Sequence, residues 1–192
     1  MLYQACHLGV QDILEIISRQ NHDFLNHLQV ISGFLQLNKQ EKAREYIKEL
    51  GLEVERTARA LNSRPPEVAA ALLTVMNRAR QSQVTMDLPA PLDLTGGTVS
   101  GRPLGSLLRS LSELALAWCP PSLTLLLQEQ ERHLTLRISC RPPQSGVQGG
   151  LGLLEKRVAA ADAVMARYGG RARLLLEGDR VETVLTVPRR EK

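Results

Sequence analysis

The sequence predicts an α+β protein in which a helical hairpin precedes a domain of mixed helices and strands. Two observations predict this class. Up to Pro65, apolar residues recur at the i, i+3, i+4 spacing of a helix. Beyond Pro66, segments with helical spacing alternate along the chain with short segments in which every second residue is apolar, as in half-buried strands. We therefore expect two domains, residues 1–63 and 66–192, and a chain of 192 residues with 43% apolar content can bury a core.

The first predicted helix begins between Leu2 and Cys6 and ends at Leu37. At ~1.5 Å per residue, such a helix is roughly 50 Å long. Its apolar side chains share one stripe, made of Val10, Ile13, Leu14, Ile17, Phe24, Leu28, Ile31 and Leu35.

A second helix is predicted directly after the first. Asn38 followed by Glu41 is the pattern of an N-cap residue with its partner at the third helical position. The helix ends at residues 64–66, where two prolines follow an arginine. Glu55 and Arg59 add an i,i+4 ion pair. The apolar face comprises Ala43, Tyr46, Ile47, Leu50, Val54 and Leu61.

Together these helices form an antiparallel hairpin whose apolar stripe is too wide to be buried within one hairpin. Pairing two copies into a four-helix bundle buries the stripe on both chains, so we expect a homodimer. The alternative is that the hairpin packs on its own C-terminal domain. In the dimer, His22 lies midway along the outer surface of the first helix, where a partner protein can reach it.

The segment after Pro66 is predicted to be an α/β sandwich, because helices gathered on one face of a mixed sheet give that architecture. Gly169 and Gly170 stop the last helix, and the last two strands form a hairpin across residues 177–180. The expected helices are 67–80, 102–118 and 151–168, and the expected strands are 83–88, 123–128, 134–140, 173–176 and 181–187.

Positive charge is concentrated in the last third of the chain. Residues 131–192 carry twelve basic and seven acidic residues, a net charge of +5, whereas the whole chain has +4. Such an excess suits nucleic acid, a nucleotide or an acidic partner protein. The segment has no interleaved aromatic residues and no nucleic-acid-binding motif, so we prefer solvated strand faces and expect no nucleic-acid partner.

Cysteine usage and hydropathy indicate the compartment. Cys6, Cys119 and Cys140 are an odd, scattered set without C-x-x-C spacing, which fits a reducing cytosol and argues against a disulfide framework. The N-terminus lacks a basic region of the signal-peptide type, and no run of about eighteen apolar residues occurs. We expect a cytoplasmic protein that does not associate with membranes.

A histidine with a neighbouring carboxylate and amide stands in the middle of the first helix. His22 and Asn26 are i and i+4, so their side chains share one face. Asp23 lies about 100° round the helix, near enough to bias the tautomer of His22 or to take its proton. This arrangement suits a phosphoryl acceptor. A metal site made of His22 and His27 is disfavoured, because five residues separate them by about 140° on a helix.

The stretch around His22 resembles the phospho-acceptor helix shared by sporulation initiation phosphotransferase B and the citrate/malate-type sensor histidine kinases. In that family a His-Asp pair is followed by Asn four residues after the His and by a Leu-Gln-hydrophobic-hydrophobic-x-Gly run. This chain supplies His22-Asp23, Asn26, the Leu-Gln-Val-Ile run of residues 28–31, and Gly33.

One position departs from the family pattern. The family has Arg directly before the His, whereas this chain has Asn21 there. The nearest arginine is Arg19, which would have to reach along one helical turn to support a phosphate.

The order of elements after residue 66 resembles the ATP-binding domain of histidine kinases, and residues 150–170 with the closing hairpin resemble that family's last glycine box and its sequel. The Asp-x-Gly-x-Gly loop that recognises adenine in the family is replaced by Arg-Pro-Pro-Gln-Ser-Gly at residues 141–146. Leu114 stands where the family has its Mg²⁺-binding Asn, and Glu113 beside it is interpreted as a solvated helix charge.

A further glycine cluster, Gly149 to Gly152, has two interpretations. Glycines before a helix N-terminus can cradle a phosphate, but a simple loop is the preferred interpretation of a lone cluster. The resemblance therefore covers nearly the whole chain, while the nucleotide-binding residues of the family are missing.

The resemblance implies a histidine phosphotransferase of a phosphorelay in sporulation-type signalling. A phosphoryl group would move from an aspartyl-phosphate of one response regulator to His22, and then to an Asp of a second regulator. His22 would be the nucleophile as a neutral imidazole. Asp23 would orient the ring and stabilise the phosphoimidazole, Asn26 would position the phosphoryl group or the partner's metal ligands, and Arg19 would support the phosphate.

The same resemblance implies no cofactor and no metal site in this chain, because the response regulator brings Mg²⁺ with its own Asp. Two other functions remain open. One is a soluble sensor histidine kinase that phosphorylates His22 from ATP. The other is a noncatalytic module that binds response regulators.

Overall fold

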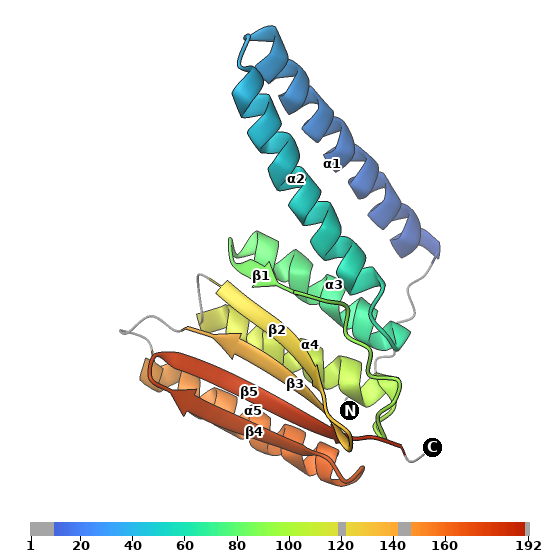
Figure 1. The fold of residues 1–192 in the computed structure, drawn as a ribbon, viewed down its shortest axis with the longest axis vertical. Coiled ribbons are helices and arrows are strands. Elements are labelled where there is room, and N and C mark those ends of the chain that lie inside the picture. The colour runs from blue at the N-terminus through green and yellow to red at the C-terminus, as the bar shows by residue number, and fades with distance from the viewer. Residues whose placement is uncertain (1–9, 119–121, 142–146, 191–192) are drawn as a thin grey trace. The chain divides into compact units, whose positions relative to one another are not determined.

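The computed structural model describes residues 10–118, 122–141 and 147–190, and the chain divides into two compact units, Met1–Glu53 and Val54–Lys192 (Figure 1). The division falls inside the second helix, on the N-terminal side of the predicted boundary at residue 63. Among the described residues, none of the helices is both long enough and apolar enough to span a bilayer.

The N-terminal unit is the antiparallel hairpin predicted from the sequence. It consists of α1 (Val10–Gln36) and the first part of α2 (Gln40–Leu61) (Figure 1). The predicted start of the first helix lies outside the described residues. Inside the hairpin, the ring of Tyr46 lies 5.9 Å from that of His27 and 6.1 Å from that of Phe34.

The turn between the two helices differs from the prediction. Asn38 has a φ of 53°, so it is not the extended N-cap residue that we expected. Instead, the N–H of Asn38 donates to the carbonyl of Leu35 (3.0 Å) and the N–H of Lys39 to that of Phe34 (2.8 Å). This pair of bonds is a Schellman motif, in which a left-handed Asn closes α1. The tight turn thus comes from the end of the first helix rather than from the start of the second.

The C-terminal unit is a five-stranded mixed sheet with three helices on one face. The sheet order is β1-β2-β3-β5-β4, with β1 parallel to β2 and all other neighbours antiparallel. The strands are β1 (Thr85–Asp87), β2 (Ser122–Glu129), β3 (His133–Cys140), β4 (Arg171–Glu177) and β5 (Arg180–Pro188), and the helices are α3 (Pro66–Gln81), α4 (Gly101–Trp118) and α5 (Val147–Ala166). The predicted fold class, α+β with an α/β sandwich, is confirmed.

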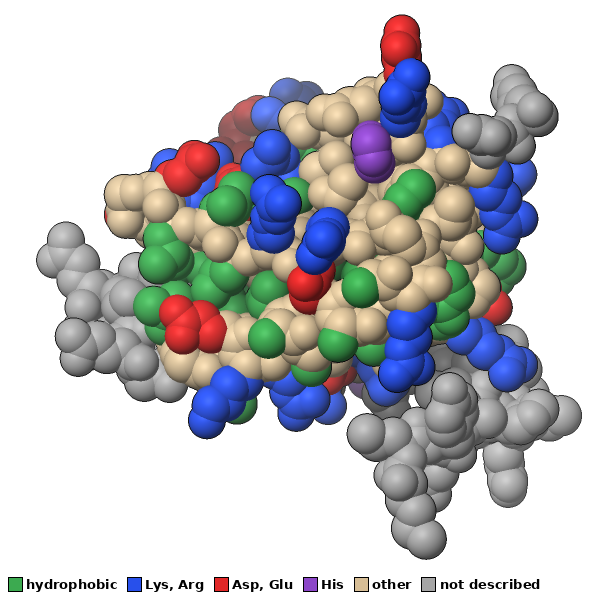
Figure 2. Space-filling model, turned by 90° about the horizontal axis from the view of Figure 1, so that it is seen from below, with side chains coloured by type: hydrophobic (Ala, Val, Ile, Leu, Met, Phe, Trp, Pro, Cys, Tyr) green, Lys and Arg blue, Asp and Glu red, His purple; other side chains and the backbone are tan. Residues whose placement is uncertain are grey.

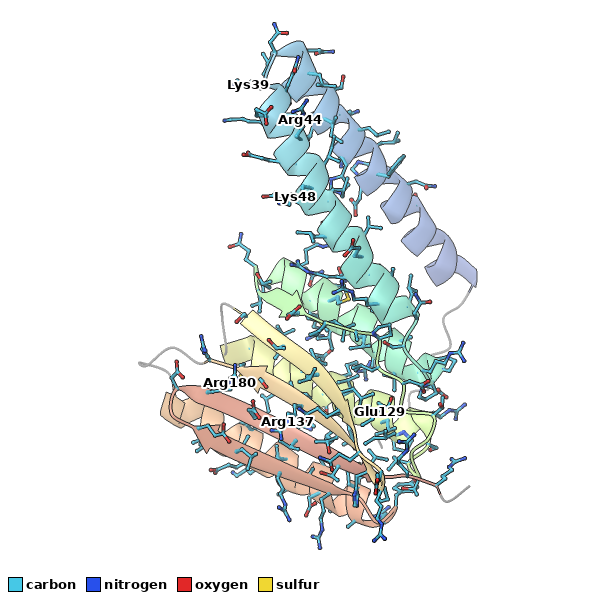
Figure 3. The ribbon with its side chains drawn as sticks, viewed as in Figure 1. Lys39, Arg44, Lys48, Glu129, Arg137 and Arg180 are labelled. Atoms are coloured by element: carbon cyan, nitrogen blue, oxygen red, sulfur yellow. The ribbon has the colours of Figure 1, made fainter. Side chains whose placement is uncertain are left out.

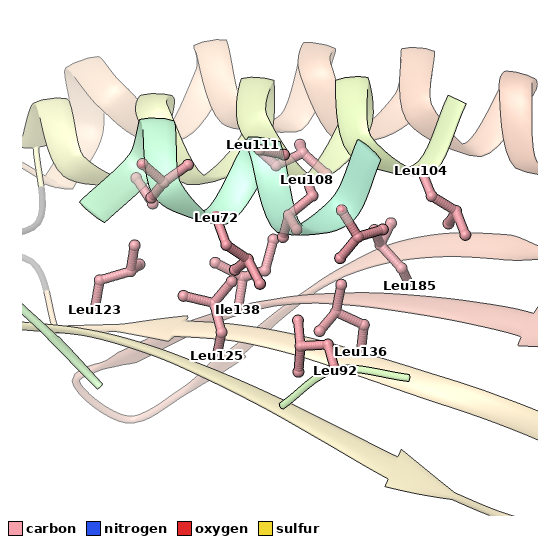
Figure 4. Close-up of a cluster of buried hydrophobic side chains, with 14 of the residues drawn as sticks. Leu72, Leu92, Leu104, Leu108, Leu111, Leu123, Leu125, Leu136, Ile138 and Leu185 are labelled. Carbon is pink, nitrogen blue, oxygen red and sulfur yellow. The ribbon is translucent and has the colours of Figure 1, made fainter. Parts of the chain in front are cut away.

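Aliphatic side chains fill the space between the helices and the sheet (Figure 4). Leucines from α3, α4, β2, β3 and β5 meet there, each at most 1% exposed, among them Leu72, Leu108, Leu125, Leu136 and Leu185. Gly105 allows α3 and α4 to pack closely, since a Cβ there would lie 2.5 Å from the backbone oxygen of Glu67.

The other face of the sheet carries a buried ion pair between neighbouring strands. Glu182 of β5 is 5% exposed and accepts hydrogen bonds from Arg137 (2.8 Å) and Ser139 (2.9 Å) of β3. Arg180 lies 3.5 Å from the same carboxylate, and Figure 3 shows Arg137 and Arg180 on the sheet. Burial raises the pKa of Glu182, but the hydrogen bonds from Ser139 and Arg137 and the two positive charges outweigh it and hold that pKa below its ordinary value.

Two predictions about this unit are wrong. Gly149 and Gly150 lie inside α5, which begins at Val147, so neither the phosphate cradle nor the simple loop describes this segment. Cys140 is disulfide-bonded, contrary to the expectation of reduced thiols, while Cys6 and Cys119 lie outside the described residues.

Candidate functional site

The predicted phospho-acceptor lies on the surface of the hairpin. The side chain of His22 is 74% exposed, and that of Asp23 is 50% exposed. The Nδ2 atom of Asn26 lies 3.1 Å from Nδ1 of His22, and Oδ1 of Asp23 lies 3.8 Å from the same nitrogen. Both neighbours therefore lie beside Nδ1, whereas the other ring nitrogen, Nε2, is accessible to solvent and to a partner protein.

This geometry has a consequence for the tautomer of His22. A carboxylate only accepts hydrogen bonds, so Asp23 favours a proton on Nδ1. The amide of Asn26 presents its nitrogen to Nδ1 at 3.1 Å, and an amide nitrogen only donates, so this side chain would have to turn and present its oxygen to accept the same proton. With the proton on Nδ1, the lone pair of Nε2 is free to act as a nucleophile. The site thus holds an exposed imidazole whose Nε2 contacts neither Asp23 nor Asn26.

His27 occupies a different environment on the same helix. Its Nδ1 lies 2.8 Å from the hydroxyl of Tyr46 on α2, in a partly buried contact. His27 therefore holds the two helices of the hairpin together, whereas His22 faces outward. Within the described residues, no three side chains of His, Cys, Asp or Glu cluster as metal ligands would.

The face on the C-terminal side of His22 carries uncharged residues. Leu25, Asn26 and Gln29, one to two turns from His22, are all exposed, and Leu25 is 57% exposed. No lysine or arginine lies among residues 21–33. On this side of His22, an approaching protein surface meets no lysine or arginine from residues 21–33. Arg19 lies on α1, three residues before His22, and its side chain is outside what the structure describes.

In the α/β unit, the position at which histidine kinases have their Mg²⁺-binding Asn holds an apolar residue. Leu114 on α4 is partly buried and packs against the core. Glu113, which we interpreted as a solvated charge, forms an ion pair with Arg78 of α3 at 3.3 Å. It therefore has a structural contact between helices, which sequence reasoning missed because Arg78 is far away in the chain. Of the replaced adenine loop, residues 142–146 lie outside the described residues.

Known proteins are similar to this chain in sequence or in structure. Residues 7–63 match the family model of the SpoOB-type sensor kinase, alpha-helical domain. A histidine kinase from Burkholderia phymatum has a similar structure, with 16% identity, a TM-score of 0.50 and coverage of 92% of each chain. The histidine kinase AdeS of Acinetobacter baumannii, at 15% identity and a TM-score of 0.48, covers 88% of this chain and 98% of its own. No curated protein sequence matches the chain closely enough to count as a relative.

The fold is therefore similar to that of a histidine kinase, with a helical domain followed by an ATPase-like sandwich. Its helical segment, residues 7–63, is related to the SpoOB-type sensor kinases, as the motif at His22 predicted.

Proposed function

We propose that this chain is a histidine phosphotransferase that passes a phosphoryl group between two response regulators through His22, in sporulation-type signalling. The observation that carries the proposal is the exposed imidazole of His22, whose Nδ1 is addressed by Asn26 at 3.1 Å and by Asp23 at 3.8 Å. Nε2 makes no contact with either neighbour, and it can attack in the tautomer that carries the proton on Nδ1.

The reaction would proceed as one displacement and its reverse. The lone pair of Nε2 attacks the phosphorus of the regulator's aspartyl-phosphate, and the phosphorus–oxygen bond to the carboxylate breaks, so the regulator's Asp leaves as a carboxylate. The imidazole keeps its proton on Nδ1 and becomes a phosphorylated cation, which the carboxylate of Asp23 stabilises. A carboxylate of the second regulator then attacks the same phosphorus and releases the neutral imidazole. Mg²⁺ would come with the regulators, and Arg19 is proposed to support the phosphate.

A homodimer is part of this proposal. Phe24, Leu28 and Leu35 follow one stripe of α1 and are 59%, 47% and 52% exposed in the single chain. Ile47 on α2 is also 50% exposed. A second hairpin would cover these side chains and complete a four-helix bundle, leaving His22 outside. The stripe and His22 lie on opposite sides of α1, since Ile31 is about 180° from His22 round the helix.

The histidine-kinase fold favours one second candidate, a kinase that phosphorylates His22 from ATP. Against it stand Leu114, an apolar side chain at the position expected for a magnesium ligand, and the ion pair that engages Glu113. A missing adenine contact costs about 1–3 kcal/mol, and a missing ligand of Mg²⁺ costs more because that ion tolerates poor geometry badly. Since about 1.4 kcal/mol is tenfold in affinity, ATP binding is expected to be weaker by several orders of magnitude.

The deciding experiment offers the full chain two phosphoryl donors. One arm uses candidate response regulators labelled on their Asp, and the other uses Mg-ATP labelled on the γ-phosphate. We expect acid-labile phosphate on His22 from a labelled regulator and none from ATP at millimolar concentration. Stoichiometric labelling from ATP would make the chain a kinase. If the chain bound a regulator but formed no phosphohistidine, it would be a noncatalytic module that binds response regulators.

A further inference from the structure

The β4 strand forms one end of the sheet, and no strand among the described residues pairs with its outer edge (Figure 1). Edge strands present unpaired backbone groups to other chains, and proteins usually cover or interrupt them. The sequence of β4, Arg-Ala-Arg-Leu-Leu-Leu-Glu over Arg171–Glu177, carries a charge near each end and three leucines between.

The hairpin turn fixes which residues of β4 point their backbone groups toward the free edge. Gly178 and Asp179 form a two-residue turn, with Gly178 at a φ of 60°. Glu177 and Arg180, which flank such a turn, form a hydrogen-bonded pair, and hydrogen-bonded and non-hydrogen-bonded pairs alternate from there. Leu176, Leu174 and Ala172 therefore direct their N–H and C=O groups away from β5.

One of these three positions is already occupied. The N–H of Ala172 donates to Oδ1 of Asp162 on α5 at 2.8 Å, which confirms that this N–H points away from β5. Within the described residues, no hydrogen bond outside the sheet ladder engages the backbone of Leu174 or Leu176. Leu176 is also 56% exposed. The open part of the edge is thus centred on Leu175.

The side chains around this centre are self-complementary. Arg173 and Glu177 are exposed and point to the face of the sheet that carries Arg137 and Glu182, and neither forms an ion pair within the described residues. We propose that β4 pairs with β4 of a second copy, antiparallel about a two-fold axis at Leu175. This axis places Arg173 of each copy opposite Glu177 of the other, with the two Leu175 side chains between these pairs.

The backbone geometry agrees with this register. Leu174 of one copy and Leu176 of the other exchange two N–H···O bonds, and the symmetric pair exchanges two more, so every open group is used. An axis at Leu174 would instead need the N–H of Ala172, which Asp162 holds. The second copy is favoured over an unrelated extended peptide by the two crossed charge pairs. Figure 2 shows more Lys and Arg side chains than Asp and Glu side chains on the face seen there. In a cross-strand pair, an acidic residue opposite Arg173 has an electrostatic advantage.

The test is disulfide trapping in the full chain. Residues opposite each other in a non-hydrogen-bonded pair have Cα atoms about 4.5 Å apart, which is within disulfide range. Leu175→Cys should therefore give a covalent dimer on mild oxidation. Leu126→Cys, on the same sheet face but on β2 and 37% exposed, is the matched control and should not cross-link above the unmodified chain.

Charge changes in the Leu175→Cys chain sharpen the result. Arg173→Glu and Glu177→Arg each place like charges opposite one another and should lower the cross-linked yield about fivefold, while the double exchange should restore it. Arg132→Glu, an equal charge change between β2 and β3, should have no effect. The proposal would be overturned if Leu175→Cys cross-linked no more than Leu126→Cys, or if its cross-linked yield did not respond to the charge exchange. The edge of β4 would then be available to an extended segment of another protein.

Two further measurements keep the test decisive. If Leu175→Cys does not fold, sedimentation of Arg173→Glu and of the double exchange tests the same charge pairs, with Leu175 intact and with Leu28→Glu added to each chain so that the hairpins do not dimerise. His22→Gln in the Leu175→Cys chain should cross-link normally, because the pairing does not rest on phosphoryl transfer. A failed relay experiment and a failed β4 pairing are therefore distinguishable.

Discussion

The hairpin and the α/β unit use apolar residues in opposite ways. In the hairpin, Phe24 and Leu28 of α1 are 59% and 47% exposed. In the α/β unit, Leu72 and Leu108 are 0% and 1% exposed. The first unit exposes apolar surface in the single chain, while the second buries its apolar side chains in its own core. The two units also differ in their proposed chemistry. The proposed nucleophile, His22, lies on the hairpin, whereas the α/β unit has the apolar Leu114 at the position where a Mg²⁺-binding residue was expected.

The largest effect we expect is on the chemistry of the hairpin. His22→Gln should lower phosphoryl acceptance from a labelled regulator by at least about a thousandfold, because it removes the nucleophile. Its fold and association should not change, since the side chain is 74% exposed. His27→Gln is the matched control and should retain acceptance while losing about 0.5–1.5 kcal/mol of stability with the Tyr46 bond. Equal loss of acceptance in both folded variants would contradict the assignment of His22.

The next effect concerns the core of the α/β unit. Leu72→Ala should lower the free energy of unfolding by about 2–5 kcal/mol, since it leaves a cavity at a fully buried position. Thermal or urea unfolding of the two units measures it. The comparison would fail if Leu28→Ala destabilised a single hairpin as strongly, because Leu28 is half exposed there.

A third prediction tests the exposed stripe. In a chain that also carries Arg173→Glu, so that the proposed β4 pairing does not contribute, Leu28→Glu should weaken dimerisation of the hairpins at least about a hundredfold, because each interface would bury two unpaired carboxylates. Sedimentation across a concentration series measures this. Leu25→Glu, 57% exposed on the His22 face, should leave the dimer intact. A wild-type chain that sediments as 21.2 kDa at micromolar concentration would remove the basis for the bundle.

A fourth prediction concerns pH and the ion pair on the sheet. The pKa of Glu182 is lower in the folded chain than in the unfolded chain, so the folded state binds the proton less readily. The stabilisation of the folded state by ionised Glu182 is complete above the ordinary glutamate pKa of about 4.3. It is lost as the pH falls through the lower pKa of the folded chain. Glu182→Gln should cost about 1–3 kcal/mol at pH 7 and flatten this acid dependence, measured by urea unfolding at several pH values. An unchanged acid slope would assign it to other carboxylates.

The smallest effect is expected at Ser112 on α4. Its hydroxyl is fully buried and has no hydrogen-bond partner among the described residues. Ser112→Ala should raise the free energy of unfolding by up to about 1 kcal/mol, because it removes an unsatisfied polar group. Ser110→Ala, which loses a 3.2 Å bond to the carbonyl of Leu107, should give no such gain. Destabilisation by Ser112→Ala would indicate that the hydroxyl has a partner in solution.

Local interactions explain what could be predicted from the sequence. The helical period gave both helices of the hairpin, and the i,i+4 spacing placed His22 beside Asn26, which the structure bears out at 3.1 Å. The ion pair of Glu55 and Arg59, at 3.3 Å, is equally local. The hairpin turn at Gly178 could likewise be predicted from the sequence, since the conformation of a two-residue turn depends on the residues in the turn.

What the sequence by itself determined about this protein is therefore the type of each element, the hairpin and the faces of α1. Tertiary structure decided the rest, through residues that are far apart in the chain. Glu113 meets Arg78 of another helix, and Glu182 is buried beside Arg137 of another strand, at separations that no helical or strand period encodes. Sequence patterns report forces that act within a few residues, whereas these partners are selected only once the sheet and helices have packed.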